Sequence, residues 1–247
     1  MDRKTIEVFW TGGYDSTFRI CQLSKKEVII QPYYVSDGRK SEEYERGAIN
    51  TITKKLQENK DTKAVIQEVK YISKEEREDS PEITQAFQNL LKQDFMGSQY
   101  EWLGTFALKH KGVEMSIHKD DKAIELISKH GKLKVEEGEE GKYYVIDKDN
   151  SEKDCITLFG NLHFPLVDYT KVQMKDEYEK MGLSDVIDDT WFCFTPIDGK
   201  PCGQCNPCKY TIEEGMAYRF TPEAMQRYRK MKSPVNRVVR KIKSIVK

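Results

Sequence analysis

Segments that predict strands alternate with segments that predict helices along the first half of the chain, and this alternation most restricts the fold. The predicted strands are rich in β-branched and aromatic residues, whereas the predicted helices repeat apolar residues every three or four positions. We place strands at 5–10, 27–35, 63–72 and 112–118, and helices at 18–26, 41–58, 81–93 and 98–111. Because such a repeat requires right-handed crossovers between parallel strands, the sequence predicts a doubly wound, mainly parallel α/β sheet.

The later part of the chain departs from this alternation. Two short predicted strands around EEGEEG indicate a β-hairpin inserted near 132–150. A cysteine-rich segment and then a strongly basic segment follow toward the C-terminus. We therefore expect an α/β domain over 1–189, a small zinc-binding region over 190–220 and a basic helical tail over 221–247.

The first predicted strand and the first predicted helix are joined by TGGYDST, residues 11–17. Gly12 and Gly13 let the backbone turn sharply and approach a ligand. Ser16 and Thr17 add hydroxyl donors, and the helix N-terminus supplies free N–H groups and partial positive charge. The segment therefore predicts an anion-binding loop, with phosphate as the anion.

This loop lacks the glycine spacing and the Lys-Ser/Thr pair of a Walker A loop. It also lacks the third glycine of the dinucleotide-binding fingerprint. The alternative interpretation is an ordinary strand-to-helix turn that Asp15 or Ser16 caps.

Four cysteines lie within 16 residues near the C-terminal end, with the spacing C-x8-C-x2-C-x2-C. Four thiolates at this spacing match a tetrahedral structural zinc site. Disulfide bonds are disfavoured in a chain with cytosolic features, and C-x-x-C pairs that share a central cysteine suit one metal better than two bridges. An iron–sulfur cluster is the remaining alternative. The predicted zinc ligands are Cys193, Cys202, Cys205 and Cys208.

The other two cysteines, Cys21 in a predicted helix and Cys155 in a predicted strand, are expected to be buried thiols. None of the four histidines has ligand spacing relative to the cysteine cluster, so we expect them at the surface or in the core. Aromatic residues within 190–194 either wall a planar substrate or pack as core.

The chain has 41 basic and 41 acidic residues, so its net charge does not indicate a nucleic-acid partner. No apolar run approaches the length of a membrane span, and the N-terminus lacks a signal-peptide core, so a cytoplasmic protein is expected. The charge is uneven, with nine Lys or Arg and one Glu over 221–247. Within it, 237–247 predicts a helix that packs on the body or meets RNA, a partner or a membrane surface.

TGGYDST resembles the SGGxDS[T] loop of the PP-loop ATP pyrophosphatases, with Thr11 in place of the usual Ser. Those enzymes bind the pyrophosphate end of ATP at this loop, cleave between the α and β phosphates, and transfer AMP to a substrate oxygen. The resemblance implies that the loop binds ATP through Trp10, Thr11, Gly12, Gly13, Tyr14, Asp15, Ser16 and Thr17.

Further segments resemble 7-cyano-7-deazaguanine synthases, a zinc-containing PP-loop family. TWFCF and PCGQC match the family's cysteine region, FPLVDYTKVQM matches its P-L-x-x-x-T-K-A-E segment, and SDGRK echoes its D-Y-G-Q-R segment. The resemblance implies ATP, Mg²⁺ and Zn²⁺ as cofactors and a homodimer. It also implies that a deazapurine carboxylate is adenylated and attacked by ammonia to give a nitrile. Asp15 is then expected to cap the helix or meet Mg²⁺ through water, and Lys171 to meet the phosphates or the adenylate.

The chain departs from the family on the substrate side. MGSQY (96–100) lacks the family's P-G-R-N, SIHKDDKA (116–123) lacks its Y-S-G-Y-P-D-C-R, and Lys209-Tyr210 replaces an Arg. These changes predict an altered acyl acceptor, such as an amine on a protein or nucleic acid. Such a role is consistent with the divergent members of the family that occur in bacterial defence systems. The alternatives are another PP-loop enzyme, such as a tRNA-modifying one, and a non-catalytic nucleotide-binding protein stabilised by zinc.

Overall fold

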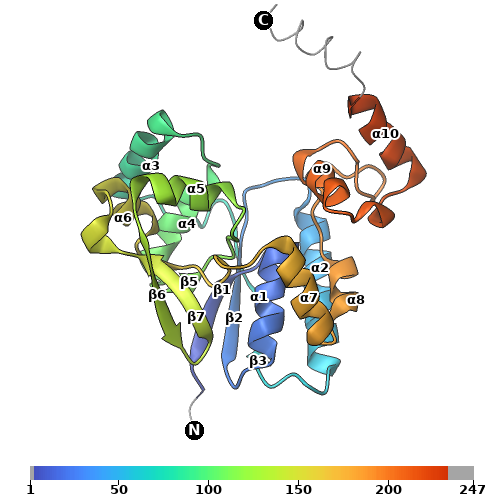
Figure 1. Cartoon of the computed structure of the whole chain (residues 1–247), viewed down its shortest axis with the longest axis horizontal. Helices are drawn as coiled ribbons and strands as arrows, with labels where there is room; N and C mark the ends of the chain where they lie inside the picture. The colour runs from blue at the N-terminus through green and yellow to red at the C-terminus, as the bar shows by residue number, and fades with distance from the viewer. Residues whose placement is uncertain (1–2, 233–247) are drawn as a thin grey trace, which may run out of the picture.

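The computed structural model describes residues 3–232 and contains one mainly parallel sheet with helices on both faces (Figure 1). The strand order is β3-β2-β1-β5-β8, and β4 pairs with β2 beyond the end of β3. Every pairing within this sheet is parallel. The strands are β1 (Thr5–Phe9), β2 (Ile29–Val35), β3 (Val65–Ile66), β4 (Lys70–Ile72), β5 (Val113–Glu114) and β8 (Leu162–His163). The predicted α/β class is confirmed.

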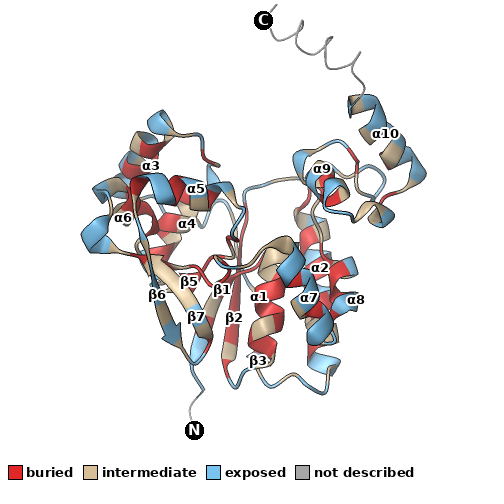
Figure 2. Cartoon of the chain, in the orientation of Figure 1, coloured by how far each residue is buried: buried red, intermediate tan, exposed pale blue. Residues whose placement is uncertain are grey.

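Alternating side chains of β1 enter two separate cores, because successive residues of a strand point to opposite faces. Ile6 and Val8 pack with the helices α1, α2, α7 and α8, whereas Phe9 packs with α3, α4, α5 and α6. Buried residues line both faces of the sheet in Figure 2. The helices are α1 (Tyr14–Ser24), α2 (Glu42–Glu58), α3 (Pro81–Gln93), α4 (Gln99–Ala107), α5 (Lys122–His130), α6 (Lys153–Phe159), α7 (Lys171–Lys180) and α8 (Ser184–Asp189).

The sheet reverses its strand order next to β1, since β2 lies on one side of it and β5 on the other. In open parallel sheets, ligands bind beyond the carboxyl ends of the strands at such a reversal. The turn between β1 and α1 lies at this place, and it contains the glycine pair of the TGGYDST segment. The topology therefore puts the predicted anion-binding loop at the position where this fold class binds its ligands.

The predicted hairpin is present as β6 (Leu133–Gly138) and β7 (Gly141–Ile146). It joins the edge of the main sheet through two main-chain hydrogen bonds between Tyr144 and Phe164, of 3.0 and 2.9 Å. Its turn is fixed by Glu140, which is buried and accepts from Lys4 Nζ at 2.7 and 2.8 Å. The hairpin thus covers the edge at β8, which limits pairing with other chains there.

The chain after α8 forms a small separate cluster of helices above α2, to one side of the strands (Figure 1). It contains α9 (Asn206–Glu213), a 3-10 turn (Ala217–Arg219) and α10 (Pro222–Lys232). The helix predicted over 237–247 lies outside the described residues. Within 3–232, none of the helices has the length and apolar character needed to cross a bilayer.

Several predicted boundaries are wrong. The third strand is broken into β3 and β4, where the Gln31 side chain donates to the carbonyl of Glu68 at 3.1 Å. Helix α1 begins at Tyr14 rather than at residue 18, and β5 has two residues instead of the seven predicted. Cys155 lies in the helix α6 rather than in a strand, although it is buried as expected. The short apolar segment around Cys155 contains β-branched Ile and Thr, which favour strands locally. Packing against α3 and α4 nevertheless stabilises this segment as a helix.

Candidate functional site

The glycine loop makes close main-chain contacts that only glycine allows. Gly12 has a φ of +67°, in the left-handed region, and a Cβ there would lie 2.8 Å from the carbonyl oxygen of Glu45 in α2. Any side chain at position 12 would therefore strain the backbone and clash with α2. The lack of a side chain at Gly12 therefore lets the loop lie close to α2.

The N-terminus of α1 has no side-chain cap. Gly13 occupies the N-cap position in an extended conformation, and neither Asp15 nor Ser16 caps the helix, so the capped-turn interpretation is wrong. The Ser16 hydroxyl lies 3.4 Å from both the main-chain nitrogen and the hydroxyl of Thr11, which leaves it weakly held. The first N–H groups of α1 thus remain available to an anion.

The two predicted catalytic residues meet at this helix end. Lys171 Nζ lies 2.5 Å from Asp15 Oδ1 and 4.7 Å from the centre of the Tyr14 ring. Lys171 is the first residue of α7, whose N-terminus is fixed by a capping box between Thr170 and Gln173. The fold therefore places an ammonium group against side chains of the first turn of α1, from a residue 156 positions away in sequence.

Two residues of the predicted ATP-binding set lie beneath the loop. Trp10 and Thr17 are fully buried, and the indole Nε1 donates to the Thr17 hydroxyl at 3.0 Å. The Tyr14 carbonyl accepts from the Tyr178 hydroxyl at 3.1 Å. These contacts hold the start of α1 against the core, while the loop above them is left to face the carboxyl edge of the sheet.

Two further ionisable residues act on this site, and sequence reasoning did not identify them. Burial raises the pKa of Glu214, Lys171 opposes this rise, and Asp15 adds to it. Glu214 follows α9 and carried no sequence signal, because its proximity to the loop depends on how the cysteine region docks. His118 also acts on Glu214 and is buried just after β5. Its place at the carboxyl end of a predicted strand could have marked it.

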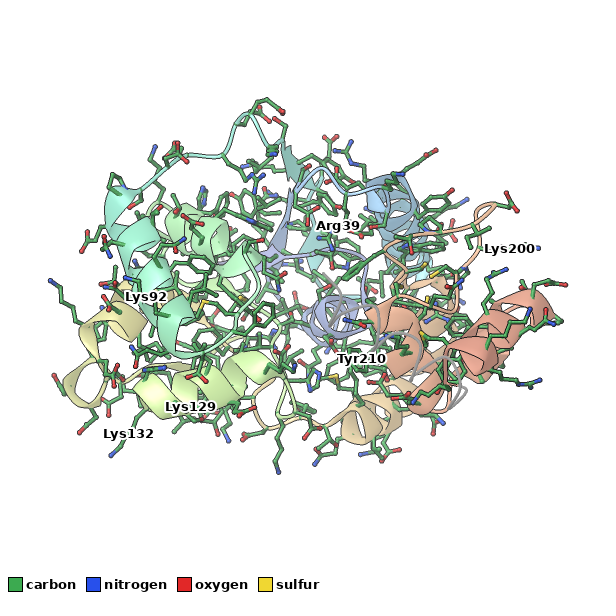
Figure 3. The ribbon with its side chains drawn as sticks, turned by 90° about the horizontal axis from the view of Figure 1, so that it is seen from above. Arg39, Lys92, Lys129, Lys132, Lys200 and Tyr210 are labelled. Atoms are coloured by element: carbon green, nitrogen blue, oxygen red, sulfur yellow. The ribbon has the colours of Figure 1, made fainter. Side chains whose placement is uncertain are left out.

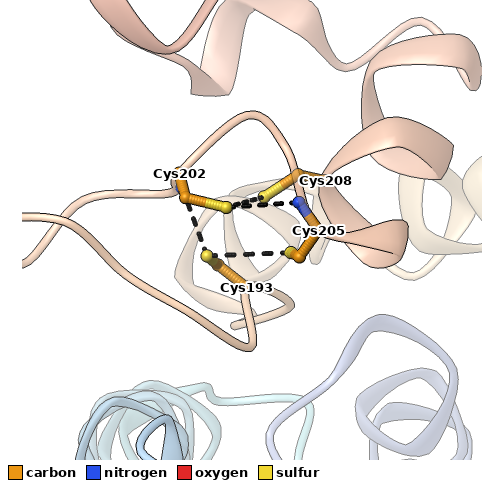
Figure 4. A group of neighbouring side chains, drawn as sticks. All are labelled: Cys193, Cys202, Cys205 and Cys208. Carbon is orange, nitrogen blue, oxygen red and sulfur yellow. Dashed lines mark hydrogen bonds between the residues drawn. The ribbon is translucent and has the colours of Figure 1, made fainter. Parts of the chain in front are cut away.

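The four predicted metal ligands come together in the structure (Figure 4). The Sγ atoms of Cys202 and Cys208 are 3.8 Å apart, those of Cys193 and Cys205 are 3.9 Å apart, and all four lie within 4.8 Å of one another. Tetrahedral coordination at a Zn–S distance of about 2.3 Å gives S–S separations of about 3.8 Å. All six cysteines are free thiols. The cluster could therefore hold a metal such as zinc.

Hydrogen bonds surround the sulfur of Cys202. The Cys202 sulfur accepts at 3.3 Å from the Thr195 hydroxyl and from the main-chain N–H groups of Gln204 and Cys205. Burial alone would raise the pKa of the Cys202 thiol, but these hydrogen bonds lower it. Since metals bind thiolates, this environment favours the ligating form. A centre with four cysteine ligands leaves no open position for substrate, which indicates a structural role.

The aromatic segment before the first cysteine contacts the glycine loop. The Trp191 N–H donates to the Gly12 carbonyl at 2.9 Å, and the Trp191 ring stacks on Tyr44 of α2 with centroids 4.7 Å apart. Phe194 is 45% exposed and lies under the guanidinium of Arg39, 5.4 Å from the ring centre. Figure 3 looks down on this edge, with α1 near the centre and the cysteine region beside it. Trp191 thus packs against the loop.

The remaining cysteines and histidines have structural surroundings. Burial raises the pKa of Cys21, and it raises that of Cys155 to about 12, so neither thiol is poised to ionise near neutral pH. His130 is buried between Asp94 and Glu152, with ring nitrogens 3.2 and 3.0 Å from their carboxylates. His130 and its two carboxylate partners stabilise the fold away from the loop.

Compared with models of known protein families and with curated protein sequences, the chain matches none of them.

Proposed function

We propose that the chain is an ATP-dependent ligase of the PP-loop type. It adenylates a carboxylate, either 7-carboxy-7-deazaguanine or a related deazapurine acid, for attack by ammonia or another amine. One observation carries this proposal: the uncapped N-terminus of α1 lies at the reversal of strand order, with Lys171 held there by Asp15. An anion at this position would meet both the free N–H groups and the ammonium.

The chemistry follows from the poor reactivity of a carboxylate. Its oxygen attacks the α-phosphorus of ATP, the bond to the bridging oxygen breaks, and pyrophosphate leaves. Ammonia then attacks the acyl carbon and AMP departs, giving the amide. A second adenylation, on the amide oxygen, lets AMP leave with that oxygen as the nitrile forms. When bound, Mg²⁺ neutralises phosphate charge.

The chain's own groups have separate roles in this scheme. Lys171 would bind the departing pyrophosphate, and Asp15 is the residue that would hold Mg²⁺ near the phosphates. The N–H groups at the start of α1 hold the phosphate oxygens. The four cysteines hold zinc and keep the region beside the loop in shape, without taking part in bond making. We further propose a cytoplasmic location, as expected from the sequence, and a homodimer, which the family resemblance implies.

Sulfur transfer, which a tRNA-modifying enzyme of this type would perform, is disfavoured. It needs a reactive thiol outside the metal centre, and only Cys21 and Cys155 are available. Both are fully buried and lie in hydrophobic clusters of the sheet domain. A thiol of raised pKa without access to solvent is a poor nucleophile.

The test is pyrophosphate release from ATP with and without 7-carboxy-7-deazaguanine, followed by mass spectrometry of the base. We expect acid-dependent release with an amide or nitrile product. Lys171→Met should lower the rate at least tenfold, because it removes the cation at the loop. Lys175→Met, one turn further along α7 and exposed, is the matched control and should keep the rate. ATP binding without any release of pyrophosphate would instead support the non-catalytic alternative. Release of pyrophosphate only with another acid would mean that this other acid is the substrate.

A further inference from the structure

Trp191 connects the glycine loop to the cysteine centre through two hydrogen bonds of its own. Its main-chain N–H donates to the Gly12 carbonyl at 2.9 Å. Its indole Nε1 donates to the carbonyl of Cys193, the first predicted metal ligand, at 2.8 Å. A single residue therefore bonds on one side to the loop and on the other side to the backbone of a ligand.

Arg219 fixes the same segment from the opposite end of the cysteine region. It donates to the hydroxyl of Thr190 at 3.1 Å, to the carbonyl of Thr190, and to the carbonyl of Asp188 at 3.1 Å. Its guanidinium also lies 4.7 Å from the centre of the Phe192 ring. The guanidinium of an arginine presents five donors in a fixed planar fork, whereas the ammonium of a lysine is a single point from which three donors rotate. The stretch that contains Trp191 is thus braced on both sides.

The loop has little freedom to move independently of this stretch. A Cβ on Gly12 would already meet the Glu45 carbonyl on one side, and Gly13 lies beside the Trp191 carbonyl, 3.7 Å from an added Cβ. The glycine pair therefore sits between α2 and Trp191. A displacement of Trp191 would remove one wall of the loop and the hydrogen bond that orients the Gly12 peptide.

We propose that Trp191 and Arg219 are positioning residues through which the four-cysteine centre sets the conformation of the glycine loop. Metal at the cysteines fixes the Cys193 backbone, Trp191 transmits that order to Gly12, and Arg219 keeps the connecting stretch rigid. The inference rests on the proposed function only in naming nucleotide as the ligand of the loop. Metal binding and nucleotide binding then strengthen each other, and by linkage each changes the other's affinity by the same factor.

The first test is amide hydrogen exchange of the peptide spanning 10–18 in the zinc-loaded full chain. Trp191→Phe keeps an aromatic ring for Tyr44 but loses the indole donor, so we expect loop exchange to rise about fivefold, as for one lost hydrogen bond. Arg219→Lys should act in the same direction. Trp102→Phe, which removes an indole from α4 instead, is the matched control and should leave the loop unchanged. Zinc content and exchange of the β2 peptide report whether each variant is folded.

The second test measures the zinc affinity by chelator competition, with and without Mg²⁺ and a non-hydrolysable ATP analogue. We expect the analogue to tighten zinc binding severalfold in the wild type and in Trp102→Phe. In Trp191→Phe this factor should fall toward one, although the four cysteines are intact. The same cycle read as analogue affinity, with and without zinc, should give equal factors.

The outcomes separate the two proposals. Unchanged loop exchange in zinc-loaded Trp191→Phe and Arg219→Lys overturns the positioning role, even if the wild type releases pyrophosphate. Altered loop exchange in a chain that binds no nucleotide leaves the positioning role standing and overturns the proposed function. A zinc affinity that ignores bound analogue in the wild type overturns the coupling between the two sites.

Discussion

The sheet domain and the cysteine region are stabilised in different ways. The sheet has a large apolar core on each face, with 21 buried residues in each cluster. Within the described residues, the core of the cysteine region has five buried residues, and three of them are the predicted metal ligands Cys193, Cys202 and Cys208. Because a core this small offsets little of the entropy of ordering its chain, we expect a metal at the four cysteines to supply part of the stability. The difference predicts that the sheet domain folds without metal, whereas the cysteine region depends on one.

The two regions also differ in charge. Residues 1–189 contain 29 basic and 37 acidic residues, whereas 190–247 contain 12 basic and four acidic ones. The net charge of zero is therefore the sum of a negative part and a positive part. Charges of these two parts attract each other where they lie within about a Debye length. Around the glycine loop, main-chain hydrogen bonds and ring stacking act together with the ion pair between Lys171 and Asp15.

Removing the metal should have the largest effect and should divide the molecule at residue 190. Structural zinc contributes about 10–16 kcal/mol in small domains, so we expect 190–232 to lose protection while the sheet stays folded. Limited proteolysis with mass spectrometry should find new cleavage only after residue 190, and added zinc should reverse it. A chelated sample in which 190–232 stays as protected from the protease as in the zinc-loaded protein would contradict this difference between the regions.

Phe159→Ala tests the stability of the other region, the sheet domain. Phe159 is fully buried on α6, with its ring 5.7 Å from that of Tyr100, so the cavity should cost about 3–5 kcal/mol. Thermal unfolding of the sheet should shift to lower temperature while the metal affinity is retained. Phe95→Ala, at a position that is 86% exposed, is the control and should change stability by less than about 0.5 kcal/mol. Loss of zinc from folded Phe159→Ala would mean that the regions are not separable.

Gly203→Ala should disturb only the cysteine region, by about 1–3 kcal/mol. Its φ is +74°, and an added Cβ would lie 2.2 Å from the carbonyl oxygen of Ala224 in α10. Gly215→Ala shares the positive φ of +88° but meets no atom within 4 Å, so it isolates the backbone strain. We expect faster zinc loss to a chelator in Gly203→Ala than in Gly215→Ala. Equal rates would show that α10 does not support the metal centre.

The smallest effect concerns the pH dependence of the hairpin. Burial would raise the pKa of Glu140, but the hydrogen bonds from Lys4 lower it below the ordinary value. A lowered folded pKa adds stability that is present above the ordinary value of about 4.3 and is lost as the pH falls through the folded pKa. Thermal melts between pH 7 and 3 should therefore show the Glu140→Gln variant converging on the wild type in acid. The exposed neighbour variant, Glu139→Gln, should run parallel to the wild type, and a constant offset for Glu140→Gln would refute the role.

Local patterns in the sequence were sufficient for the class of fold and for both candidate centres. Alternating apolar periods predicted the parallel sheet, and the hairpin was recognised from two strands around a glycine turn. The spacing of Cys202, Cys205 and Cys208 predicted a metal centre, because ligands close in sequence must also be close in space. The glycine pair marked the loop for the same reason, since its whole geometry lies within seven residues.

Only the tertiary structure decided which distant groups meet. Lys171 reaches Asp15 across 156 positions, Glu214 approaches both from the cysteine region, and Trp191 connects the two centres. It also decided that α6 is a helix and that the third strand is broken, against local propensity. The physical reason is that periodicity and spacing are properties of short windows. Contacts between distant residues depend instead on crossovers and on packing between faces, which no single window contains.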